Sequence, residues 1–150
     1  MDFKVLCDSI FRLYLYADNC KMIHYSTDSN HEHELADKIR DNIIDFTDEL
    51  AESTFGFYGK PKFNDMSIKH DIQVTNDLGK LCQSVVDIAE MIRETCVKKE
   101  KLSGVVSLID DFKKDMSKNV FLATFDKVSN YRMKKQYIEY HQKNKRPTNS

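Results

Sequence analysis

Four long stretches of this chain repeat apolar residues at alternating steps of three and four, which is the period of an amphipathic α-helix. The first predicted helix covers residues 2–25 and carries its stripe from Phe3 to Cys20. The other three predicted helices cover residues 30–55, residues 76–99 and residues 103–123. Only four of the 150 residues are glycine and two are proline, so little in these stretches breaks a helix. The sequence therefore predicts an all-α fold.

The segments between these helices predict how the helices are connected. Residues 26–30 read STDSN, which favours turns and helix caps, so the first two helices form a hairpin. Residues 56–74 hold two glycines and a proline and show no long period, which predicts a crossover loop with one short helix. Two hairpins joined by one long crossover make a ferritin-like four-helix bundle. We expect this bundle over residues 1–124 and a basic C-terminal extension over residues 125–150.

Composition excludes several other classes of protein. The chain has no run of eighteen apolar residues, so a membrane-spanning helix is not expected. Asp2, Asp8 and Arg12 interrupt the N-terminal region, where a signal peptide needs unbroken apolar sequence. The four cysteines have no CxxC spacing and fall within helical patterns, which favours reduced core residues over a zinc site. These features predict a soluble, cytoplasmic protein without a membrane partner.

Charge is unevenly distributed along the chain. The net charge is −1, but residues 125–150 carry seven Lys or Arg against two acidic residues, a balance of +5 that leaves −6 on residues 1–124. Five of these basic residues are candidates for binding nucleic acid: Lys134, Lys135, Lys143, Lys145 and Arg146. Such side chains neutralise phosphates and would give DNA binding that weakens steeply with salt. A basic end that only keeps the protein soluble is an equal alternative.

Residues 31–52, HEHELADKIRDNIIDFTDELAE, place metal-binding side chains on one face of the second predicted helix. With His33 at 0° on a helical wheel, Asp37 falls at about 40°, Asp48 at about 60° and Glu52 at about 100°. The apolar stripe falls between about 200° and 300°, so this face points away from the core. A solvated acidic face is the ordinary alternative for an amphipathic helix.

Spacing along this helix decides how such a face would bind a metal ion. Asp37 and Asp48 are about 16 Å apart along the axis, too far for one ion to contact both. If two copies of the helix pack antiparallel about a two-fold axis, His33 and Asp37 of one copy come opposite Asp48 and Glu52 of the other, which completes two identical sites. Nitrogen and carboxylate ligands suit ferrous iron, and an open coordination position would admit dioxygen or peroxide.

The motifs HELAD at residues 33–37 and DELAE at residues 48–52, with His24 before Tyr25 in the first helix, resemble the Dps family of DNA-protecting mini-ferritins. The resemblance implies an iron-oxidising site shared between two subunits, whose metal ligands by position are His24, His33, Asp37, Asp48 and Glu52. It implies that Fe(II) is oxidised by peroxide or oxygen and that ferric iron is stored in a hollow, dodecameric shell. Some members of the family also bind DNA through basic tails.

Other functions stay open on the sequence alone. One is a ferritin-like scaffold without catalysis, acting as a structural or interaction protein. Another is a DNA-binding protein that works mainly through residues 125–150. His24 lies on or beside the apolar face of its helix, where a core histidine is as expected as a metal ligand. We expect Tyr14 to pack rather than to carry electrons, and no partner spacing gives His70 a role.

Overall fold

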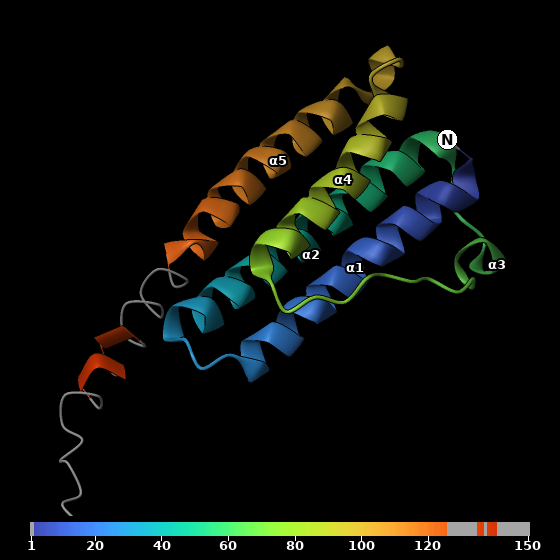
Figure 1. Ribbon diagram of the computed structural model, residues 1–150. Helices are drawn as coiled ribbons and strands as arrows, with labels where there is room; N and C mark the ends of the chain where they lie inside the picture. Colours follow the sequence, from blue (N-terminus) through green and yellow to red (C-terminus); the bar gives the residue numbers. More distant parts are fainter. Residues whose placement is uncertain (1, 126–134, 137, 141–150) are drawn as a thin grey trace, which may run out of the picture.

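The computed structural model describes residues 2–125, 135–136 and 138–140, and these residues form helices with no strand (Figure 1). The elements are α1 (Phe3–Ser26), α2 (Asn30–Tyr58), α3 (Phe63–Met66), α4 (Leu78–Cys96), the 3₁₀ turn η1 (Glu100–Leu102) and α5 (Ser103–Ala123). The all-α prediction is confirmed, and each long helix begins and ends within about three residues of its predicted limits. Most of the segment assigned to the basic extension lies outside the described residues.

The helix ends follow from local chemistry. The Asp2 side chain accepts a hydrogen bond from the Lys4 amide at the start of α1, and the Ser29 hydroxyl accepts one from the Glu32 amide at the start of α2. These bonds satisfy amide groups that have no partner within the helix. Gly59 follows α2 with φ of 107°, a conformation in which a β-carbon would be strained.

The four long helices lie side by side, and each packs on two others (Figure 1). Helix α1 packs on α2 and α4, and α5 also packs on both α2 and α4. Leu13, Ile43, Val85 and Ile109, one from each long helix, are completely buried between them. The ring of Phe46 on α2 stacks on Phe112 of α5 with 3.7 Å between ring centroids. The apolar stripes therefore meet in one core, as the periodicity predicts.

All four cysteines are free and buried, two on α1 and two on α4. Burial raises the pKa of both the Cys20 and the Cys82 thiols to about 12. These thiols stay neutral near pH 7 and are poor nucleophiles. They act as small apolar core residues.

The segment between α2 and α4 crosses over α1 and is attached to it at three points (Figure 1). Arg12 Nε donates to the Asp71 carbonyl at 3.1 Å. Asn19 exchanges two hydrogen bonds with the Thr75 backbone, at 2.8 and 2.9 Å. The third attachment is His70, whose ring stacks on Phe11 with 4.9 Å between centroids.

No described helix is long and apolar enough to cross a membrane.

His70 has an acceptor at each ring nitrogen. Nδ1 lies 2.8 Å from Asp8 Oδ1 and Nε2 lies 2.9 Å from the Met66 carbonyl oxygen. Because both partners accept, only the imidazolium satisfies both. Partial burial opposes the charged form, but the bonds to Asp8 and Met66 prevail and raise the pKa of His70 above 6.5. Residue spacing does not predict this role, because Asp8 and His70 are distant from each other in the chain.

The attachment through His70 is expected to weaken at alkaline pH. A raised pKa in the folded state stabilises the crossover below the ordinary pKa of histidine and loses that contribution as pH rises through the raised value. Amide exchange in residues 67–75, corrected for intrinsic rates, should be about tenfold faster at about pH 9 than at about pH 6. The variant His70→Ala should exchange fast at both pH values, whereas His31→Ala should behave like the wild type. Equal pH dependence in wild type and His70→Ala would contradict the assignment.

Candidate metal site along the interface of α1 and α2

His24, near the end of α1, and His33, in the first turns of α2, stack face to face. Their ring centroids are 3.6 Å apart and their planes differ by 27°. His24 Nδ1 lies 3.0 Å from the His33 carbonyl oxygen, and His33 Nδ1 lies 2.9 Å from the His24 carbonyl oxygen. His24 is buried and His33 is exposed. Each ring is therefore held by the backbone of the other residue, across the short turn that joins the two helices.

This arrangement fixes the tautomer of both rings. A carbonyl oxygen only accepts hydrogen bonds, so Nδ1 of each ring must carry the proton. In the neutral rings the lone pair is then on Nε2, and neither Nε2 has a hydrogen-bond partner among the described residues. Metal ions bind the neutral imidazole through such a nitrogen, and a hydrogen bond from the other nitrogen orients the ring. The pair thus offers two pre-oriented nitrogen ligands.

Asp37, one turn after His33, joins this cluster. Its Oδ1 lies 3.2 Å from His24 Nδ1 and 2.6 Å from Lys21 Nζ. The hydrogen bond from Lys21 lowers the pKa of Asp37, and the charge of Lys21, with those of His24 and His33 when these rings are protonated, acts in the same direction. The carboxylate is ionised near pH 7, but its oxygen is already engaged by an ammonium group. A metal ion that binds Asp37 must displace Lys21 or share the carboxylate with it.

Asp48 and Glu52 lie further along α2 and are exposed. The Tyr14 hydroxyl of α1 donates a hydrogen bond to Asp48. Burial, this bond and the charges of Asp48 and Glu52 raise the pKa of Tyr14. Tyr14 therefore stays protonated near pH 7 and holds the Asp48 side chain against α1.

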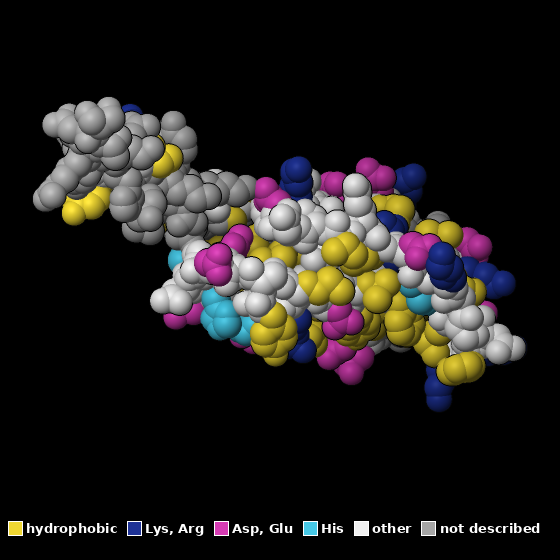
Figure 2. All heavy atoms as spheres, turned by 60° about the horizontal axis from the view of Figure 1, so that its bottom comes forward, with side chains coloured by type: hydrophobic (Ala, Val, Ile, Leu, Met, Phe, Trp, Pro, Cys, Tyr) yellow, Lys and Arg dark blue, Asp and Glu magenta, His cyan; other side chains and the backbone are white. Residues whose placement is uncertain are grey.

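The four α2 residues lie outside the core, as the helical wheel predicts, and are partly or fully exposed. Three of them, His33, Asp37 and Asp48, also contact side chains of α1. Lys21 and Tyr14 each hydrogen-bond one of the acidic residues, which a wheel of α2 alone does not show. At the surface, histidine side chains are visible with acidic side chains nearby (Figure 2). The candidate site is therefore a row of polar contacts along the α1–α2 interface, with cationic and hydroxyl donors from α1 and acids from α2.

The five predicted ligands do not meet within one chain. His24, His33 and Asp37 lie together near the turn between α1 and α2. Asp48 lies about 16 Å from Asp37 along the axis of α2. Within the part of the chain that the structure describes, no three His, Cys, Asp or Glu side chains are arranged to hold a metal ion. A metal site that combines these histidines with Asp48 and Glu52 would need a second copy of the chain.

The residues predicted to bind nucleic acid fall mostly outside the described residues. Lys134, Lys143, Lys145 and Arg146 are among those not described. Lys135 is exposed and helical.

Comparisons with protein-family models, curated proteins and solved structures found no match to this chain. The resemblance to the Dps family therefore rests on the motifs within residues 24–52.

The tautomers of the stacked pair are open to direct measurement. Long-range ¹H–¹⁵N spectra at about pH 8, above the ordinary pKa of histidine, should show Nδ1–H for both His24 and His33. His31 supplies an internal control, because its Nε2 lies 3.0 Å from the Leu122 carbonyl oxygen and should carry the proton. An Nε2–H tautomer at His24 or His33 would remove the free nitrogen on which a metal site depends.

Proposed function

We propose that this chain binds ferrous iron and oxidises it with peroxide or dioxygen at a site completed by two copies of the chain. The observation that supports this most directly is the stacked pair of His24 and His33, whose Nε2 atoms are both left for a metal ion. The resemblance to the Dps family supports the same chemistry. Iron is here the substrate rather than a resident cofactor.

The positions of the ligands along α2 support pairing through this helix. The midpoint of the segment from His33 to Glu52 is also the midpoint of the segment from Asp37 to Asp48. It falls between Asn42 and Ile43. An antiparallel pair of α2 helices with its two-fold axis at that point would place each nitrogen-bearing half beside a carboxylate half. Ile44, at about 20° on the same wheel, lies on the ligand face near this centre and is only partly buried within one chain, which leaves it available for contact.

Each residue has a role in this proposal. His24 and His33 provide nitrogen ligands, and Asp48 and Glu52 of the second copy provide oxygen ligands that favour ferric over ferrous iron. Asp37 assists from beside His24, directly or through water. Two Fe(II) ions each give one electron to a peroxide molecule, which takes up two protons and leaves as two waters. The ferric product would collect inside a hollow assembly, and a ferritin-like bundle of α1, α2, α4 and α5 is the proposed building block.

A non-catalytic role is the second candidate, and the contact between Lys21 and Asp37 favours it. The ammonium lies 2.6 Å from the carboxylate, so the negative charge of Asp37 is already paired without a metal ion. In that case the helices would be a cytoplasmic scaffold or interaction protein. Nucleic-acid binding through residues 125–150 fits either candidate, and truncation after Phe125 would test it.

Iron oxidation should depend on both halves of the site. Anaerobic Fe(II) loading followed by peroxide should give a fast rise in ferric absorbance in wild type. The variants His33→Ala and Glu52→Gln should slow it at least about tenfold, because even indirect partners of metal ligands change activity by that factor. Glu49→Gln is the matched control, since Glu49 is also exposed on α2 but lies off the proposed metal-binding face.

Co-expression of the two inactive variants separates a shared site from a site within one chain. In a mixed dimer of His33→Ala with Glu52→Gln, one of the two shared sites keeps both residues, so part of the activity should return. A site within one chain would stay inactive in every mixture. Wild-type oxidation no faster than buffer alone would leave the scaffold as the function.

A further inference from the structure

A row of carboxylates follows the exposed side of α2. Its members are three or four residues apart, so they fall within about 80° of one another around the helix. The acidic row comprises Glu34, Asp37, Asp41, Asp45, Asp48 and Glu52. Five of them are exposed and Asp37 is partly exposed. Three of the six are proposed metal ligands, and the iron chemistry gives no role to the other three.

Cations offset only part of this charge. Lys21 Nζ lies 2.6 Å from Asp37 Oδ1, and Arg40 Nη1 lies 3.0 Å from Asp41 Oδ1. Within the described part of the chain, no other carboxylate of the acidic row is in an ion pair. Six carboxylates against two cations leave a charge of −4 on this side of α2.

The acidic row is nearly symmetric about the midpoint at which two α2 helices are proposed to pair. In an antiparallel pair about that point, Asp37 lies level with Asp48 of the second copy. Asp41 lies within about 1.5 Å, along the helix axis, of the level of Asp45 in the second copy. The two outermost members of the row have the same relation. Pairing therefore sets each carboxylate of the row beside a carboxylate of the other chain.

Little else on this side of α2 compensates for the repulsion between these carboxylates. Like charges that face each other across an interface oppose association. Between the ends of the acidic row, the same side of the helix carries two apolar residues, Ile44 and Ala51, and both are already partly buried within one chain. Lys38 and Glu49 lie beside the row and offset each other. Two metal-free chains should therefore repel each other along α2.

We propose that two chains pair through α2 only when divalent metal ions are bound, so that the metal-free chain is a monomer. Each ion brings two positive charges between Asp37 of one copy and Asp48 and Glu52 of the other, which replaces repulsion with attraction. Ions that bind only the paired state shift the equilibrium toward it. This inference rests on the shared site proposed above, and it adds that metal loading and assembly occur together.

The mass of the full chain in solution tests this coupling. Mn²⁺ is the probe, because it accepts the same nitrogen and carboxylate ligands as Fe(II) and avoids the oxidation step. Sedimentation velocity should give a monomer in the presence of a chelator and a dimer, or a larger assembly of dimers, with Mn²⁺. A dimer in the presence of the chelator would overturn the coupling but not the shared site. A monomer at saturating Mn²⁺ would overturn both.

Two double variants with the same change in charge test the electrostatic cause. Asp41→Asn with Asp45→Asn removes two carboxylates of the acidic row that are not proposed ligands. Pairing should then need at least about tenfold less Mn²⁺, because the repulsion falls while the ligands stay. Asp111→Asn with Asp115→Asn is the control, since both residues are exposed on α5 at the same spacing of four. Equal Mn²⁺ midpoints for the two double variants would rule out the proposal.

Discussion

The antiparallel packing of α1 against α2 is the contact on which the rest of this structure depends. Its register is set by the short turn between Ser26 and Asn30, which brings His24 against His33. From there α1 and α2 meet at successive levels, through Lys21 with Asp37, Tyr14 with Asp48, and finally Phe3 with Phe55. A shift of one helix by a single residue would break all four contacts.

The polar contacts between α1 and α2 contribute less to the stability of the fold than the apolar core does. Buried residues such as Leu13 and Ile43 stabilise the fold through apolar burial. The Lys21–Asp37 pair is partly exposed, with side-chain exposures of 33% and 42%, and such pairs contribute little to stability because solvent screens them. Displacing Lys21 from Asp37 would therefore affect folding little. The polar contacts between α1 and α2 can rearrange while the apolar core stays intact.

Helix positions were predictable because they depend on neighbours in the chain. The stripe through residues 3–20 and the capping residues of the STDSN segment are local signals, and the structure confirms both, with Ser29 as the N-cap of α2. The third helix was predicted over residues 76–99 but ends at Cys96, because the chain tightens there into the 3₁₀ turn η1. Helix ends of this kind depend on the packing of the following segment as well as on the local sequence.

Partners distant in the chain were not predictable from spacing. A wheel of α2 gives the direction of Asp48 but not the hydroxyl of Tyr14 that it meets, because that depends on the register of α1. Likewise, spacing left His24 equally suited to the core and to a ligand set. In the structure His24 is buried, its Nδ1 is taken by the carbonyl oxygen of His33, and its Nε2 has no hydrogen-bond partner among the described residues.

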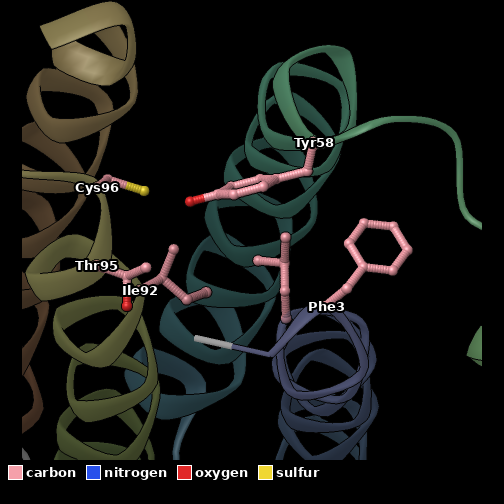
Figure 3. A pocket seen from close by; sticks show the side chains of 6 residues that line it. Phe3, Tyr58, Ile92, Thr95 and Cys96 are labelled. Atoms are coloured by element: carbon pink, nitrogen blue, oxygen red, sulfur yellow. The ribbon is translucent and has the colours of Figure 1, made fainter. Parts of the chain in front are cut away.

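The two ends of the helix pair differ in how their polar groups are satisfied. At the histidine end, backbone carbonyls fix the rings and Lys21 pairs with Asp37. At the other end, the Tyr58 hydroxyl (Figure 3) is buried and has no hydrogen-bond partner within the described part of the chain, although an ammonium group lies over its ring. About 31 Å of packed apolar core separates the ends along α1, and changes at sites this far apart act additively on free energy unless a two-state element links them. Substitutions at the two ends should therefore change the free energy of unfolding additively.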